Sequence, residues 1–223
     1  MSLAIFDLDN TLLSCDSDHA WGEFLVEQGA VDAAAYRRAN DTFLSDYREG
    51  KLDLDAYLAM ALKPLTEHGD EQLKAWHQQF MASRIEPHVL ARGEELLAWH
   101  RRRGDFLLIV TATNRFITGP IAERLGVDDL IAVEVERKNG RYTGNIEGVP
   151  SYREGKVTRV NAWLEAQPRL TLDDAWFYSD SINDRFLLEA VPNPVAVDPD
   201  DELRKLANEQ QWRVMSLRDG STR

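Results

Sequence analysis

The chain has 223 residues, of which 43% are hydrophobic and 29% charged, so its composition is that of an ordinary globular protein. This length is enough for one sizeable core, alone or with a smaller inserted unit. The formal net charge of −12 disfavours nucleic acid and anionic membranes as partners, because both repel a negative surface.

The first predicted element is a short apolar run at residues 3–8, which indicates a buried strand with Asp7 and Asp9 near its carboxyl end. Residues 16–86 then lack a convincing strand, and their apolar residues recur at helical spacing. We expect a small helical cap inserted here, with its exit near Pro87, because proline disfavours helix in the residue before it. The faces that predict its helices are Trp21, Phe24, Leu25 and Gln28; Leu58, Ala61, Leu62 and Leu65; and Leu73, Trp76, His77 and Phe80.

Beyond the cap, apolar runs that predict strands alternate with helical patterns, which indicates a parallel sheet covered on both faces. Asn139-Gly140 predicts a two-residue hairpin turn, so residues 136–150 are expected to form a β-ribbon. The predicted fold is α/β, a doubly wound parallel sheet built from residues 1–15 and 87–223, with an all-helical cap at 16–86. The predicted core strands are 3–8, 105–110, 131–135, 174–179 and 194–198.

Two carboxylates, Asp7 and Asp9, follow the first strand at the edge where open α/β sheets bind ligands. Carboxylates one residue apart repel each other unless a cation lies between them. Aspartate oxygens suit Mg²⁺, which keeps several waters and takes few protein carboxylates. The pair therefore predicts a Mg²⁺ site, although an Asp-x-Asp after a strand is also a common helix cap.

Two further features lie where they can hold an anion. Thr111, followed by Ala112, ends the predicted strand 105–110, and a hydroxyl with backbone N–H groups at a helix start binds anions. Lys156 begins a helical pattern at 154–166, where its charge can neutralise a phosphoryl group. Taken singly, the threonine is an ordinary cap and the lysine an ordinary surface charge.

The last feature, Asp180-Ser181-Ile182-Asn183-Asp184, directly follows the predicted strand 174–179 and adds carboxylates at the same edge of the sheet. Alone it is also compatible with a turn held by side-chain hydrogen bonds. Because all four features fall in order at the end of a strand or the start of a helix, we interpret them as one site.

These four features resemble the signature motifs of the haloacid dehalogenase superfamily of phosphatases. The resemblance covers essentially the whole chain. The helical insert after the first motif, and Tyr142–Gly148 ahead of Lys156, are similar to the phosphoserine-phosphatase-like branch. The matching motifs are Asp7-x-Asp9-x-Thr11, Thr111, Lys156 and Asp180-Ser181-x-Asn183-Asp184.

The resemblance implies a phosphatase in which Asp7 is the nucleophile and becomes an aspartyl phosphate. It implies that Asp9 protonates the leaving group and then activates water. It also implies that Mg²⁺ is held by Asp7, the backbone carbonyl of Asp9, and Asp180. For the other residues it implies phosphate binding by Thr111, Ala112, Lys156 and Asn183, with Asp184 in the next layer around the metal and Lys156.

The predicted cap indicates the kind of substrate. Phosphoserine phosphatases carry a carboxylate near the start of the cap that binds the substrate ammonium, and Asp16 lies at that distance from Asp7. Their carboxylate-binding arginine falls on Ala61 when residues 49–52 set the register, although Arg48 is another possible source. An amine without a carboxylate therefore fits best, since an unpaired carboxylate in a closed site is costly.

Histidinol phosphate is such an amine, and it is the preferred small phosphorylated metabolite. The stretch 111–117 also resembles members of the branch assigned to this substrate. Asp18, His19 and Trp21 lie where an imidazole would be met, with packing inside the cap as the favoured interpretation of His19 and Trp21.

Three alternative functions stay open: a phosphoserine phosphatase, a phosphotransferase or mutase that protects the aspartyl phosphate from water, and a non-catalytic regulatory protein. The single cysteine, Cys15, excludes an intramolecular disulfide and suits a reducing compartment. The start of the chain lacks a basic signal-peptide region, so we expect a cytoplasmic protein. The oligomeric state is left open.

Overall fold

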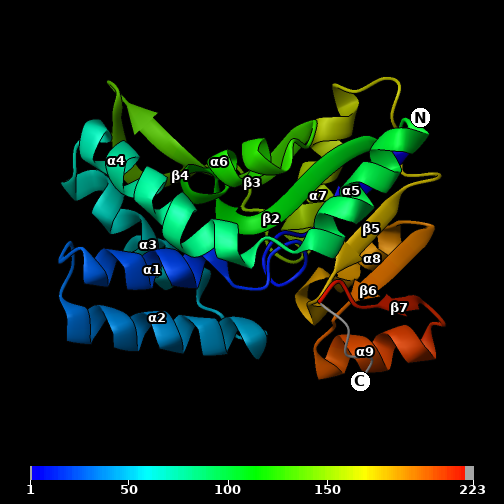
Figure 1. Ribbon diagram of the computed structural model, residues 1–223, viewed down its shortest axis with the longest axis horizontal. Coiled ribbons are helices and arrows are strands. Elements are labelled where there is room, and N and C mark those ends of the chain that lie inside the picture. The colour runs from blue at the N-terminus through cyan, green and yellow to red at the C-terminus, as the bar shows by residue number, and fades with distance from the viewer. Residues whose placement is uncertain (1, 219–223) are drawn as a thin grey trace.

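A seven-stranded sheet forms the centre of the computed structural model, which describes residues 2–218 (Figure 1). The strands lie in the order β4-β3-β2-β1-β5-β6-β7, and only β3 and β4 pair in antiparallel fashion. The predicted α/β class with a parallel sheet is therefore confirmed. The strands are β1 (Leu3–Phe6), β2 (Phe106–Asn114), β3 (Asp129–Lys138), β4 (Arg141–Glu147), β5 (Trp176–Ser179), β6 (Asn193–Val197) and β7 (Arg213–Met215).

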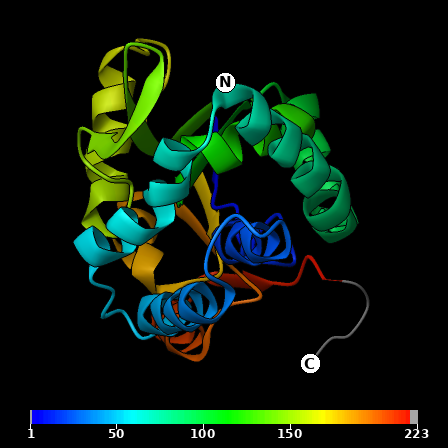
Figure 2. The same cartoon turned by 90° about the vertical axis from the view of Figure 1, so that its left-hand side faces the viewer.

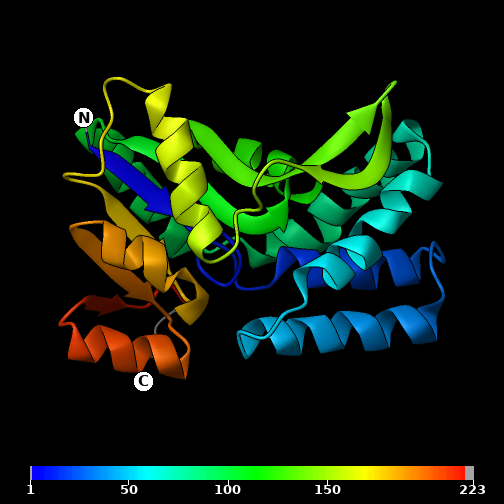
Figure 3. The same ribbon diagram turned by 180° about the vertical axis from the view of Figure 1, so that it is seen from behind.

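Central strand β1 divides its side chains between two apolar cores, one on each face of the sheet. Ala4 and Phe6 belong to the first core, and Leu3 and Ile5 to the second, as the period of two of a strand requires. Helices α5 (Ala91–Arg103) and α6 (Arg115–Leu125) supply the first core. The opposite face is covered by α7 (Glu154–Glu165), α8 (Arg185–Ala190) and α9 (Asp201–Glu209), as Figure 3 shows.

The segment between β1 and β2 is helical throughout its middle, and no strand lies between residues 16 and 86 of the described chain (Figure 2). Three of its helices begin after an N-cap carboxylate, since Asp16, Asp32 and Asp53 each accept a hydrogen bond from a backbone N–H. The division of the chain into two separate units stays a prediction. The segment's elements are α1 (Ser17–Glu27), α2 (Ala33–Arg48), α3 (Leu54–Glu67), α4 (Asp70–Phe80), a π-helix at Met81–Ile85 and a 3₁₀-helix at Glu86–His88.

Aromatic packing holds this helical segment against the sheet layer. The Trp21 ring lies 5.4 Å from that of Phe116 on α6, and it also contacts Phe24, His77 and Phe80. Only 2% of Trp21 is exposed, so the favoured interpretation, packing rather than ligand contact, agrees with its position.

The predicted β-ribbon is the hairpin of β3 and β4. Its turn residues Asn139 and Gly140 both have positive φ angles, 52° and 79°, which is the conformation that an Asn-Gly hairpin turn needs. The hairpin extends the sheet beyond its parallel part, and α3 packs against β4. Within the described residues, no helix combines the length and apolar character required to cross a bilayer.

Two strands are longer than predicted, and one expectation about Thr111 is wrong. Strand β2 runs to Asn114, so Thr111 lies inside it rather than at its end. The strand continues because its register with β3 shifts after Val110 and pairing resumes at Asn114, which then caps α6. The helix therefore begins at Arg115 and not directly after Thr111. Strand β7 was not predicted.

Candidate active site

Asp7 lies one residue beyond β1, at the point where the chain leaves the sheet. Its backbone N–H donates to the carbonyl of Tyr178 on β5 at 2.9 Å, which ties the residue to the neighbouring strand. Only 6% of Asp7 is exposed. Burial raises the pKa of its carboxyl to about 6, with Lys156 opposing and Asp184 adding to the shift.

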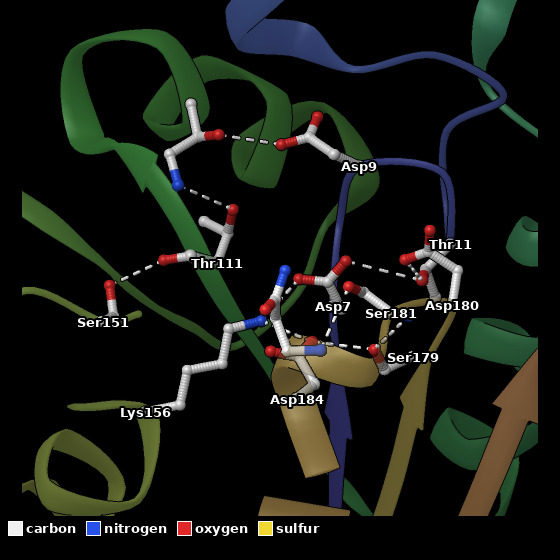
Figure 4. A network of polar contacts seen from close by, with 12 residues as sticks. Asp7, Asp9, Thr11, Thr111, Ser151, Lys156, Ser179, Asp180, Ser181 and Asp184 are labelled. Carbon is white, nitrogen blue, oxygen red and sulfur yellow. Dashed lines mark hydrogen bonds and ion pairs between the residues drawn. The ribbon is translucent and has the colours of Figure 1, made fainter. Parts of the chain in front are cut away.

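Lys156 joins two of the predicted acidic residues in one buried cluster (Figure 4). Its Nζ donates to Asp7 Oδ1 and to Asp184 Oδ2, each at 2.7 Å. Burial by itself lowers the pKa of this amine, but the charges of Asp184 and Asp7 outweigh it and raise the pKa, so the ammonium form is held. The helix start predicted at residue 154 is confirmed, and it places Lys156 in the first turn of α7.

Asp184 is almost fully buried behind the lysine. Its Oδ2 also accepts a hydrogen bond from Ser179 Oγ at 2.7 Å, whereas its Oδ1 has no partner among the described residues. This carboxylate thus fixes Lys156 from the side away from the cavity and does not line the cavity itself.

Asp180 meets Asp7 across the hydroxyl of Thr11. Thr11 Oγ1 donates to Asp180 Oδ1 at 3.2 Å and lies 3.5 Å from Asp7 Oδ2. Burial raises the pKa of Asp180 well above its ordinary value, and the charges of Asp7 and Asp184 raise it further. Two carboxylates that both resist ionisation, with only a hydroxyl between them, form a site that a cation would stabilise.

Asp9 points to a different part of the site, toward β2. Its Oδ1 accepts from the backbone N–H of Ser17 at 2.7 Å, and its Oδ2 accepts from Thr113 Oγ1 at 2.8 Å. Burial raises the pKa of Asp9 well above its ordinary value, with the charge of Asp16 as a further cause. The carboxyl therefore favours its protonated form, which is the form a proton donor needs.

Thr111 and Ala112 lie on β2 and line the cavity in front of Asp7. The backbone N–H of Thr113 donates to Thr111 Oγ1 at 3.1 Å, and Ser151 Oγ donates to the carbonyl of Thr111 at 2.6 Å. These bonds hold the segment where the strand register shifts. Thr111 and Ala112 are therefore in reach of a group bound at Asp7, and their phosphate-binding role stays a prediction.

Asn183 forms a hydrogen bond to the helical segment and does not line the cavity. Its Nδ2 donates to the carbonyl of Tyr47 at 2.7 Å. Beside it, Arg153 donates to the carbonyl of Gly50 at 3.0 Å. These two bonds attach the end of α2 and the residues after it to the core, next to the buried cluster around Lys156. Phosphate binding by Asn183 requires the second N–H of Nδ2 or a rearrangement of this contact.

The cavity between the sheet edge and the helical segment is rich in carboxyl groups. No lysine or arginine of the described chain lines it, and its ionisable side chains include His19 and five carboxylates. Lys156 reaches Asp7 from behind and is not part of the lining. The lining carboxylates are Asp7, Asp9, Asp16, Asp18 and Asp180.

Asp16 lies at the cavity wall, as predicted, and also caps α1. Its Oδ1 accepts from the backbone N–H of His19 at 2.8 Å. Ala61, by contrast, is buried inside the helical segment and does not line the cavity, whereas Tyr57 on the preceding turn does. Arg48 lines an adjoining cleft that shares Asp16 with the cavity. The position of Ala61 therefore does not support the prediction that this residue stands where a carboxylate-binding arginine would contact the substrate.

For a metal ion, the described residues offer few ligands. They contain no group of three or more His, Cys, Asp or Glu side chains placed to hold a metal. The pair of Asp7 and Asp180 remains, with backbone carbonyls nearby. Such an oxygen donor set, poor in protein carboxylates, suits Mg²⁺ with its retained waters.

Three hydroxyl groups for which the sequence motifs predicted no role complete the site. Thr11, Thr113 and Ser179 bind Asp180, Asp9 and Asp184, respectively. Thr11 belongs to the first motif, so its position was a usable signal. Nothing local in the sequence signals the contact of Thr113 with Asp9, because the two residues are 104 positions apart.

Comparison with known proteins assigns the chain to a family. The haloacid dehalogenase-like hydrolase family matches residues 4–189. A protein of Neisseria meningitidis named histidinol-phosphatase is 45% identical and covers 97% of this chain and 99% of its own length. The phosphoserine phosphatase SerB1 of Mycobacterium tuberculosis is 29% identical over 96% of this chain and 70% of its own.

Solved structures agree with this assignment. A protein of unknown function from Bordetella pertussis has a TM-score of 0.90 at 45% identity and covers 97% of this chain and 99% of its own. A substrate-bound phosphoserine phosphatase shares the fold, with a TM-score of 0.71 at 18% identity and coverage of 97% and 93%. The chain belongs to the haloacid dehalogenase-like hydrolases and is a phosphatase of that family.

Proposed function

We propose that this phosphatase is a Mg²⁺-dependent phosphomonoester hydrolase whose preferred substrate is histidinol phosphate. The observation that carries the substrate choice is the lining of the cavity, which combines five carboxylates with no lysine or arginine. A substrate with a cationic amine is attracted to such a cavity, whereas a carboxylate in the substrate finds no lysine or arginine in the lining to pair with. The relative from Neisseria, which bears the histidinol-phosphatase name, supports this choice.

Asp7 is the proposed nucleophile. One of its carboxylate oxygens forms a bond to phosphorus, and the bond from phosphorus to the substrate oxygen breaks. Lys156 holds Asp7 in place at 2.7 Å and neutralises part of the negative charge that gathers there. The leaving oxygen takes a proton from Asp9, whose raised pKa keeps that proton available.

The second step returns both aspartates to their starting forms. Asp9, now ionised, removes a proton from water, and the hydroxide attacks phosphorus as the bond to the Asp7 oxygen breaks. Inorganic phosphate and the free carboxylate of Asp7 result. Thr113, which binds Asp9 at 2.8 Å, keeps the acid and base oriented through both steps.

Mg²⁺ would be held by the side chains of Asp7 and Asp180 and by the backbone carbonyl of Asp9. The raised pKa values of both carboxyl groups support this assignment, because a nearby cation would stabilise their ionised forms. When bound, the cation offsets the repulsion between a carboxylate and a phosphate anion.

The test compares kcat/KM for histidinol phosphate and phosphoserine on the purified protein, with free phosphate as the product measured. We expect histidinol phosphate to be favoured at least about tenfold, since about 1.4 kcal/mol in the transition state suffices. Equal or better hydrolysis of phosphoserine would show that the choice is wrong. Arg48, which lines the adjoining cleft, would then be the first residue to replace.

Asp16→Asn tests the proposed ammonium contact. Asparagine caps a helix as well as aspartate does, so the start of α1 is kept while the charge is lost. We expect kcat/KM for histidinol phosphate to fall relative to that for an aryl phosphate, which has no amine. An unchanged ratio would remove Asp16 from substrate recognition.

A further inference from the structure

The helical segment forms one part of the cavity and contributes a second carboxylate, Asp18, beside Asp16. Asp18 lies two residues beyond Asp16 on α1, and both residues line the same cavity. Tyr57 of α3 lines the cavity as well, and its side chain acts to lower the pKa of the Asp18 carboxyl. The apolar side chains that the helical segment contributes to the cavity lining are Phe43, Leu44, Leu52 and Leu54.

Asp18 is a half-buried carboxylate without a cationic partner in residues 2–218. No lysine or arginine of this range forms an ion pair with it, and the nearby His19 directs its Nε2 to Asp41 at 2.9 Å. Burial raises the pKa of Asp18 to about 7, with the charge of Asp16 as a further cause. A carboxylate that loses hydration and gains no protein cation is unfavourable, so its retention in a cavity points to a ligand.

An imidazole ring has the chemistry to satisfy this position. It keeps an N–H donor in both its neutral and its cationic form, so it can always donate to a carboxylate. Its ordinary pKa of about 6.5 lets it carry positive charge next to Asp18 near neutral pH. The ring is also flat, and the leucine and phenylalanine walls can pack against its faces. Asp16 remains free for the amine.

We infer that Asp18, supported by the Tyr57 hydroxyl, determines specificity by accepting a hydrogen bond from a ring nitrogen of the substrate. The helical part of the cavity then takes an imidazole or a similar nitrogen-containing ring. This inference rests on the proposed function and identifies the residue that distinguishes the ring from a simple amine.

The test uses two substrates that both carry an amine, histidinol phosphate and phosphoethanolamine, of which only the first has a ring. The quantity of interest is the ratio of kcat/KM for the two compounds on the same protein. Loss of folded enzyme cancels in this ratio, so a purely structural role of Asp18 would not change it. Asp18→Asn should lower the ratio about tenfold or more. Tyr57→Phe should lower it less, because the carboxylate remains.

Asp55→Asn is the matched control, because Asp55 is exposed on the same helix as Tyr57 and does not line the cavity. The ratio of kcat/KM for histidinol phosphate to that for phosphoethanolamine should be the same in Asp55→Asn as in the wild type. A ratio in Asp18→Asn within about twofold of the wild-type value overturns the inference and leaves the proposed function intact. Preference of the wild type for phosphoserine overturns the proposed function and this inference together.

Discussion

At the scale of the residue, the site contains more carboxyl groups than cations, because Lys156 is its one buried ammonium among the described residues. Lys156 binds Asp7 and Asp184 at the same distance of 2.7 Å, whereas Asp9 and Asp180 have only hydroxyl and N–H partners. Burial of this kind raises the pKa values of Asp7, Asp9 and Asp180. Buried carboxyl groups without a cationic partner lower the stability of the folded protein. Groups with such perturbed pKa values are typical of functional sites, and the proposed cation would stabilise their ionised forms.

Asp7→Asn should abolish turnover while leaving the fold intact. An amide does not form the acyl phosphate, so phosphate release should fall by about 10³-fold or more. The free energy of unfolding should not decrease, because burial already disfavours the ionised form of Asp7. Steady-state kinetics and urea unfolding measure the two effects, with Asp55→Asn as the control. Near-normal activity of Asp7→Asn would refute the proposed mechanism.

Lys156→Met should destabilise the protein strongly at neutral pH. Two buried carboxylates then lose their common cation, which typically costs about 3–5 kcal/mol. The folded-state pKa of Asp7, already raised to about 6, should rise further, so the loss should shrink as the pH falls toward 5. Urea unfolding at pH 7.5 and pH 5 checks this. Lys205→Met, at an exposed position on α9, is the control and should change stability little at either pH.

At the scale of the element, the entry to α7 determines where Lys156 lies. The residue before the helix, Arg153, has φ 51° and ψ −123°, a conformation that ordinary residues rarely adopt. Gly155 is packed so tightly that a Cβ atom built there would lie 2.1 Å from the carbonyl oxygen of Pro150. The turn therefore combines a strained residue with a close backbone approach directly before the lysine.

Gly155→Ala should displace this turn and lower both stability and activity. The contact with the Pro150 carbonyl involves backbone on both sides, so we expect a loss of about 1–3 kcal/mol and a clear fall in kcat. Gly119→Ala on α6 is the matched control, because its Cβ would meet only Arg115 Cγ at 3.9 Å. That change should alter stability by less than about 1 kcal/mol, because Pro120 follows directly and offsets the helix preference of alanine. Equal effects of the two substitutions would contradict this account.

At the scale of the whole molecule, a net charge of −12 surrounds a cavity that is itself acidic. A phosphate ester therefore approaches against the general field of the protein, and local groups have to compensate. Lys156 is one, and the proposed Mg²⁺ is the other. Binding of a divalent cation should consequently change the stability of the whole chain as well as its activity.

Mg²⁺ should raise the unfolding temperature and be required for turnover. A ligand that binds only the folded state stabilises it, so the shift should grow with Mg²⁺ concentration. Sodium chloride at the same ionic strength controls for charge screening. Asp180→Ala should reduce the shift, and a chelator should remove activity. Ca²⁺ should inhibit, because its looser coordination lets Asp7 bind with both oxygens. Full activity in chelator would disprove the metal requirement.

Asp18→Asn should stabilise the ligand-free protein at high pH. The folded-state pKa of Asp18 is raised to about 7 from an ordinary 3.8, so the folded state holds more protons between these values. The contribution of Asp18 to stability therefore falls as the pH rises through that window. The gain from Asp18→Asn should reach up to about 4 kcal/mol at pH 8 and vanish near pH 4. Urea unfolding across this range measures it, and a gain independent of pH would contradict the assignment.

The sequence by itself determined the class of the fold and predicted which acidic residues gather at one edge of the sheet. Apolar runs, helical spacing and the Asn139-Gly140 turn are local properties, because side-chain period and backbone φ depend on few neighbours. Parallel strands bring their carboxyl ends to one edge, which is why the motif residues at Asp7 and Asp180 were expected together. The motif resemblance then indicated a phosphatase of the haloacid dehalogenase superfamily, and the comparison with known proteins confirmed that class.

Only the tertiary structure decided what surrounds this cluster. The bonds of Asp9 to Thr113 and of Asn183 to Tyr47 join residues 104 and 136 positions apart, and no local pattern encodes them. The position of Ala61 inside the helical segment, away from the cavity, depended on how α3 packs against β4. Substrate recognition depends on such packing, because a cavity is formed by whichever side chains the packed elements leave facing it.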